Sequence, residues 1–103
     1  MSDTVNQLQL LQQNMESLME QKRAMQEQLF ELDSAMQSLP GSKQSYKIVG
    51  KLLIAKDVNE LQTELKEEHN QFELQMNEIE TQERAIKEKM QTLQKELLEE
   101  TKQ

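Results

Sequence analysis

The chain has 103 residues, of which 30% are charged and 3% aromatic, and its formal net charge is −7. So few large apolar side chains cannot fill a rounded core, whereas Glu, Lys, Gln and Leu with almost no Gly or Pro are typical of long helices and coiled coils. The acidic balance argues against a nucleic-acid surface, because affinity for phosphates depends on clustered Lys and Arg.

A helix is predicted over residues 3–38. Its apolar seam follows a heptad repeat, and the a and d positions are Leu8, Leu11, Met15, Leu18, Lys22, Met25, Leu29, Leu32, Met36 and Leu39. Only Lys22 is polar. Pro40 disfavours helix in the residue before it, and Gly41 gives the backbone more conformational freedom. We therefore expect the helix to end near Ser38 and residues 39–45 to form a loop.

A β-hairpin is predicted over residues 46–56, within the segment SYKIVGKLLIA. Two short runs rich in Ile, Val, Leu and Tyr flank Gly50 and Lys51. Glycine accepts the positive φ of the first turn position at little cost. Alternation along the strand places Tyr46 and Ile48 on the same face.

A second helix is predicted over residues 58–102. Asp57, followed three residues later by Glu60, resembles a capping box at its start. The seam consists of Val58, Leu61, Leu65, Glu68, Phe72, Met76, Ile79, Glu83, Ile86, Met90, Leu93 and Leu97. The step of four residues from Phe72 to Met76, where three are expected, is a stutter that locally unwinds a coiled coil.

The two helices are expected to fold back on each other, since their patterns match and the connection is too short for a parallel return. Counting outward from the connection pairs Leu39 with Val58, Leu18 with Ile79 and Leu11 with Ile86. The predicted fold is therefore mainly α: an antiparallel coiled-coil helical hairpin with a central β-hairpin, in a single domain over residues 1–103.

The predicted β-hairpin carries apolar side chains on more than one face, and both of its edges are unpaired. A two-stranded hairpin alone is marginal in water, and the helical seam already faces the partner helix. We therefore expect hairpins from several chains to join in a larger sheet or barrel, which hides edges and apolar faces together. The alternative is that the hairpin packs on its own helices as a capping loop.

Both chain termini would then lie at the free end of the coiled coil. Val5, Leu10 and Leu98 are apolar residues off the seam near these termini, where helix ends fray. They are a candidate surface for binding other proteins, and the alternative is that they are scattered surface residues without a role. Five of the seven methionines lie on the seam and are interpreted as core residues, which leaves Met1 and Met19 as surface candidates.

The sequence predicts no enzyme activity, no cofactor and no metal site. The sole histidine, His69, lies on a predicted helix face without convergent ligands, and the chain has no Gly-rich phosphate loop. The absence of cysteine excludes disulfides and thiolate chemistry. Neither a secretion signal nor an apolar run near the ~20 residues that span a bilayer is found, so we expect a soluble cytoplasmic protein.

The segment YKIVGKLLIAKDVNEL, from Tyr46 to Leu61, resembles the central segment of the beta-class subunits of prefoldin. In that family a Tyr-Lys-x-Val-Gly-x-Leu-Leu/Ile core lies between two coiled-coil helices and follows a short loop, here LPGSKQS. The single hairpin resembles the beta class, because the alpha class has two. Ser45 and Lys51 depart from the residues that are common there, which leaves the partner subunits open.

The resemblance implies a hexamer of two alpha-class and four beta-class subunits, with hairpins in a double β-barrel and six coiled coils hanging from it. Members are ATP-independent chaperones that hold unfolded polypeptides between the coiled-coil tips and pass them to a group II chaperonin. The implied assembly residues are Tyr46, Ile48, Val49, Gly50, Leu52, Leu53 and Ile54. The implied substrate-binding residues are Val5, Leu10, Leu93, Leu97 and Leu98. A structural coiled-coil scaffold or tether with folded partners is the alternative function.

Overall fold

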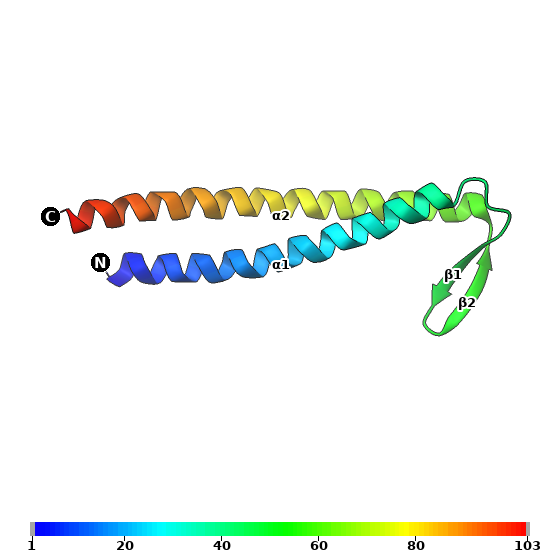
Figure 1. The fold of residues 1–103 in the computed structure, drawn as a ribbon, viewed down its shortest axis with the longest axis horizontal. Coiled ribbons are helices and arrows are strands. Elements are labelled where there is room, and N and C mark those ends of the chain that lie inside the picture. Colours follow the sequence, from blue (N-terminus) through cyan, green and yellow to red (C-terminus); the bar gives the residue numbers. More distant parts are fainter. Residues whose placement is uncertain (1, 103) are drawn as a thin grey trace. The chain divides into compact units, whose positions relative to one another are not determined.

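The computed structural model describes residues 2–102, which form two long helices and a two-stranded antiparallel sheet (Figure 1). In chain order the elements are α1 (Ser2–Ser38), β1 (Ser45–Val49), β2 (Leu52–Lys56) and α2 (Val58–Thr101). The predicted mainly α fold with a central β-hairpin is confirmed. β1 begins at Ser45, which had been assigned to the loop, and the Ser45 hydroxyl donates a hydrogen bond to the Lys56 carbonyl at 2.6 Å.

The helix boundaries follow the local signals in the sequence. α1 ends at Ser38, two residues before Pro40, and Gly41 has a φ of +88° in the turn that follows. At the start of α2, the Glu60 backbone N–H donates to Asp57 Oδ2 at 3.2 Å, so Asp57 is the predicted N-cap.

The turn of the hairpin lies at Gly50 and Lys51, as predicted. Tyr46 lies opposite Ala55 and Ile48 opposite Leu53, while Val49 and Leu52 close the turn. Gly50 has a φ of +60°, and no residue other than glycine has a positive φ within residues 2–102. This is the pattern of a turn with glycine at its first central position.

The chain divides into two compact units, each of which contains a stretch of α1 against an antiparallel stretch of α2. One unit consists of residues 2–24 and 76–102, and the other consists of residues 25–75 and includes the hairpin. The single domain over residues 1–103 stays a prediction.

Each unit has its own small apolar core, drawn from the predicted seam. The buried side chains are Leu18, Met76, Ile79 and Leu93 in the first unit, and Leu32, Leu39 and Leu61 in the second. The remaining seam residues are half-buried, except for Glu68, which is exposed. His69, the next residue along the chain, is half-buried although it was not assigned to the seam. The sequence placed His69 on a helix face without convergent ligands, and in the structure its Nε2 lies 2.8 Å from Asp33 Oδ1 on the other helix.

Within residues 2–24 and 76–102, the predicted register between the helices was wrong by about one heptad. Counting from the pair of Leu18 and Ile79 places Lys22 opposite residue 75, but Lys22 Nζ lies 2.8 Å from Glu83 Oε1. Likewise Thr4 would face residue 93, whereas its hydroxyl donates to Glu100 Oε1 at 3.4 Å. A shift of seven residues preserves the match of apolar positions, so the seam alone does not select the register.

Candidate interaction surfaces

The β-hairpin is the most apolar exposed surface of residues 25–75. Ile48 is 73% exposed and Leu52 is 67% exposed, although both belong to residue types that usually lie inside a protein. The exposed large apolar residues of the hairpin are Tyr46, Ile48, Val49, Leu52, Leu53 and Ile54. These are the predicted assembly residues apart from Gly50, which forms the turn between them.

Both faces of the hairpin contribute to this surface. The register places Tyr46, Ile48, Leu53 and Ala55 on one face. The other face carries Lys47 and Lys56, which contact α2, and also the exposed side chains of Val49, Leu52 and Ile54. The sheet contains only β1 and β2, so each strand has one edge without a hydrogen-bonding neighbour among the described residues. Such edges accept further strands.

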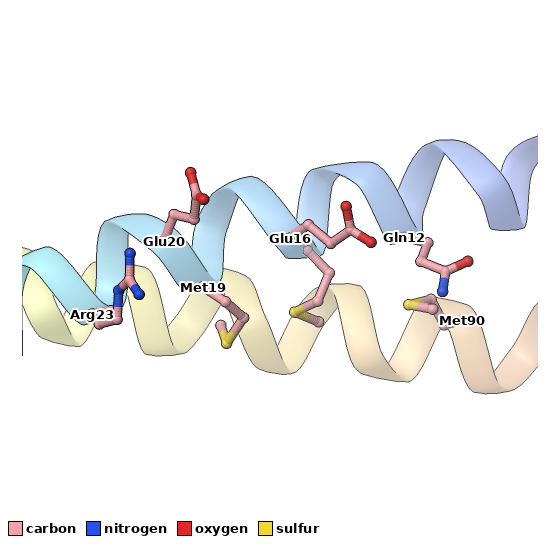
Figure 2. A pocket seen from close by; sticks show the side chains of 7 residues that line it. Gln12, Glu16, Met19, Glu20, Arg23 and Met90 are labelled. Carbon is pink, nitrogen blue, oxygen red and sulfur yellow. The ribbon is translucent and has the colours of Figure 1, made fainter.

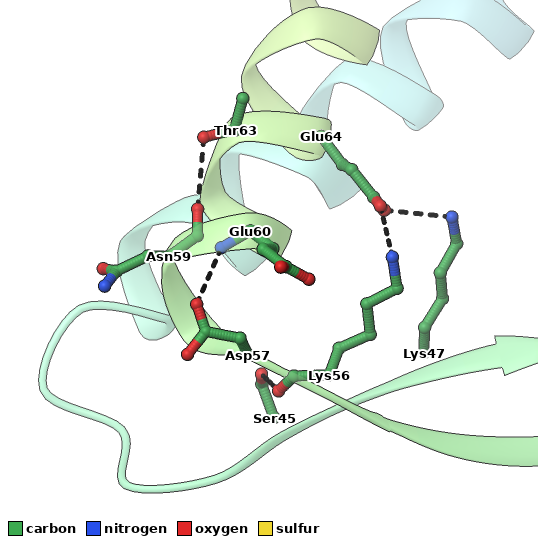
Figure 3. A network of polar contacts seen from close by, with 8 residues as sticks. All are labelled: Ser45, Lys47, Lys56, Asp57, Asn59, Glu60, Thr63 and Glu64. Atoms are coloured by element: carbon green, nitrogen blue, oxygen red, sulfur yellow. Dashed lines mark hydrogen bonds and ion pairs between the residues drawn. The ribbon is translucent and has the colours of Figure 1, made fainter.

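A polar cluster attaches the hairpin to α2 (Figure 3). Glu64 accepts hydrogen bonds from the ammonium groups of Lys56 on β2 and of Lys47 on β1, the latter at 3.0 Å. The hydrogen bond from Lys56, followed by that from Lys47, holds the pKa of Glu64 below its ordinary value. The same contact raises the pKa of Lys56. One carboxylate therefore holds both strands.

The predicted substrate-binding residues near the termini differ in their exposure. Val5, Leu10 and Leu98 are exposed, and Leu98 is 62% exposed. Leu97 is half-buried, and Leu93 is only 7% exposed because it belongs to the core of this unit. Three of the five residues are thus available in this structure. Met1 lies outside the described residues, and Met19 is half-buried.

Two exposed apolar residues had not been singled out from the sequence. Phe30 on α1 and Leu74 on α2 lie off the seam in residues 25–75, and both are well exposed. Their position outside the heptad pattern is the signal that could have identified them.

Within residues 2–102 there is no group of three or more His, Asp and Glu side chains that could hold a metal ion. Neither α1 nor α2 has, over its described length, an apolar stretch long enough to cross a membrane.

Comparisons with known proteins agree with the fold. A family model described as prefoldin subunit matches residues 2–103. The prefoldin beta subunits of Thermococcus kodakarensis and Pyrococcus horikoshii are each 33% identical to this chain over 92 residues, which is 86% of this chain and 79% of each relative. The crystal structure of the prefoldin beta subunit from Thermococcus strain KS-1 is similar with a TM-score of 0.87 at 28% identity, covering 92% of this chain and 86% of that one.

The match in sequence runs almost the full length of the chain, and the match in structure includes the single hairpin between two helices. The resemblance expected from the central segment is confirmed. The chain belongs to the prefoldin subunit family, in its beta class, and has the general role of a chaperone subunit that associates with other prefoldin subunits.

Proposed function

We propose that this chain is a holdase subunit of a cytoplasmic, prefoldin-type hexamer, which binds unfolded polypeptides at its coiled-coil tips without ATP and passes them to a group II chaperonin. Its partners in the hexamer are two alpha-class and three further beta-class subunits. The observation that carries the proposal is the hairpin, which exposes six large apolar side chains and two strand edges.

The hairpin surface supports the assembly step. Fully burying one large aliphatic or aromatic side chain contributes roughly 1.5–3 kcal/mol. Association costs an estimated ~4–15 kcal/mol, so several such side chains must be buried together before a complex is stable. Joining hairpins edge to edge in a barrel buries the side chains and completes the backbone hydrogen bonds in one step. This is why assembly in a double β-barrel is the favoured use of the hairpin.

The terminal residues support the binding step. Val5, Leu10 and Leu98 are exposed apolar side chains in one unit, formed from both ends of the chain. Each offers a small apolar contact, so binding would be weak at one tip and strong only when several tips act together. We assign Leu93 and Leu97 to the same segment, where Leu93 is buried and Leu97 is half-buried.

The triple variant Val5→Ser, Leu10→Ser and Leu98→Ser tests the tip mechanism. We expect it to assemble normally with an alpha-class subunit, because only exposed contacts are removed. The concentration needed to suppress aggregation of a denatured test protein should rise roughly tenfold or more, because the apolar contacts with the client are lost. Light scattering measures aggregation, and native mass measurement measures assembly. Substitution is preferable to truncation, because removing residues 93–103 would also remove the buried Leu93.

Leu74→Ser is the matched control, since Leu74 is a similarly exposed leucine outside the terminal unit, which is the unit of residues 2–24 and 76–102. It should suppress aggregation as the unmodified chain does. If the triple variant retains full holding activity, the tip mechanism is wrong. If the unmodified hexamer fails to suppress aggregation, the scaffold or tether function replaces the holdase function proposed here.

A further inference from the structure

A methionine-lined groove runs along the side of the coiled coil in the terminal unit (Figure 2). It has a volume of about 650 Å³, within the range of sites that bind ligands. Met15, Met19 and Met90 line it, the first two from α1 and the third from α2, and all three are half-buried. The sequence had placed Met15 and Met90 in the core only, yet both also face this groove.

Methionine suits a surface that must accept many partners. Its side chain is unbranched and its sulfur is polarisable, so it adapts to apolar groups of different shape. The seam of this unit is already closed by buried Leu18, Met76 and Ile79. Met19 follows Leu18 in α1 and is half-buried, and in Figure 2 its side chain extends from α1 on the side of α2. It is therefore available to a ligand in addition to its contacts within the coiled coil.

The rim of the groove is mainly acidic. Glu16 and Glu20 line it at a spacing of four residues on α1, where two like charges repel each other and destabilise a helix. Neither carboxylate forms an ion pair within the described part of the chain, and Figure 2 shows Glu20 directed away from α2. Arg23 also lines the rim, so the lining side chains together carry a net charge of −1. Two unpaired carboxylates beside an apolar groove favour a ligand that brings cationic side chains.

We propose that this groove is a subsite for segments of unfolded polypeptide in which apolar side chains stand beside Lys or Arg. The apolar side chains lie against Met19 and its neighbours, and the cations lie near Glu16 and Glu20. The inference rests on the proposed function and adds to it a preference for the charge of the client. It places client contacts along the side of the coiled coil, in addition to the exposed residues at the termini.

Two labelled peptides of equal length and leucine content test the inference, one with lysine and the other with glutamate at the same positions. Fluorescence anisotropy measures their binding to the full chain at low and high salt. We expect the lysine peptide to bind roughly 2- to 10-fold more tightly at low salt, with the difference shrinking at high salt. Met19→Gln should weaken its binding by roughly 10-fold, whereas the control Leu74→Gln should bind as the unmodified chain does.

The variant Glu16→Gln with Glu20→Gln should bind both peptides with similar affinity, because only the charge preference is removed. Both residues are exposed, so this variant gives a result even if Met19→Gln unfolds. Equal binding of the two peptides by the unmodified chain, or unchanged binding by folded Met19→Gln, would overturn the groove while leaving the tip mechanism standing. Binding of neither peptide would also overturn this inference, whereas the proposed function is decided separately by the aggregation assay on the hexamer.

Discussion

At the scale of single residues, Lys22 and Glu83 interrupt the apolar seam of the terminal unit on opposite helices and face each other. Lys22 Nζ lies 2.8 Å from Glu83 Oε1, and Lys87 Nζ lies 2.7 Å from the second carboxylate oxygen. The hydrogen bond from Lys22, followed by that from Lys87, lowers the pKa of Glu83 to about 2. The same contact raises the pKa of Lys22. A charged pair at the seam favours one register among those that differ by a heptad.

We predict that Glu83→Gln lowers the thermal midpoint of the chain by a few degrees near neutral pH, because Lys22 then lies at the seam without a counter-charge. The pKa of Glu83 is below its unfolded value of about 4.5, so the stabilisation is complete above that pH. It is lost as the pH falls from about 4.5 toward 2. Circular dichroism melts should therefore show a difference between the two proteins that shrinks in acid.

Glu96→Gln is the control for this prediction, since Glu96 is exposed on the same helix. Its thermal midpoint should follow that of the unmodified chain at every pH. A difference between Glu83→Gln and the unmodified chain that persists undiminished at the acid end would contradict the ion-pair explanation.

At the scale of elements, Glu64 on α2 sets the position of the β-hairpin, because it holds Lys47 of β1 and Lys56 of β2 together. We predict that Glu64→Gln weakens assembly with an alpha-class subunit several-fold while the helix content is unchanged. The neutral side chain cannot hold two cations, so the hairpin adopts more orientations relative to α2. More conformational entropy is then lost when assembly fixes one of them. Analytical ultracentrifugation of the mixture measures the complex, and Glu67→Gln, at an exposed site nearby, is the control.

The pH dependence of assembly is a second test of the contact between Glu64 and the two lysines. The pKa of Glu64 is held below its ordinary value, so the contact is present above the unfolded pKa and is lost as the pH falls below it. Assembly of the unmodified chain should therefore weaken in acid more than that of Glu64→Gln. Equal acid sensitivity of the two proteins would show that Glu64 does not position the hairpin.

The sequence predicts the elements of this fold well, because each boundary has a local cause. Pro40 follows α1, Asp57 caps α2, and Gly50 occupies the turn position that requires a positive φ. The register of the helices could not be predicted, since the apolar pattern repeats every seven residues. The contact of Glu64 with two lysines was also missed. It depends on the orientation of the hairpin relative to α2, and no periodicity in the sequence encodes that orientation.

At the scale of the whole molecule, one chain combines a hairpin that exposes large apolar side chains with the exposed apolar residues Val5, Leu10 and Leu98 near its termini, where we propose weak binding of clients. Linking several weak sites raises the overall affinity by roughly 10²–10⁴-fold without any new contact. The two faces of the hairpin are therefore expected to control client binding, although in the proposed mechanism they touch no client.

We predict that Ile48→Asp with Leu52→Asp abolishes assembly with an alpha-class subunit, because each substitution places a charge on a different face of the hairpin. Helix content should be unchanged, and the affinity for a denatured test protein should fall roughly 100-fold at equal chain concentration, since each chain then binds alone. Lys51→Glu changes the net charge by the same amount at the exposed turn without removing an apolar group, and should assemble and bind normally. Native mass measurement and anisotropy with labelled client give the two readouts. If the unassembled variant binds client as tightly as the assembled protein, the affinity for clients does not come from several tips acting together.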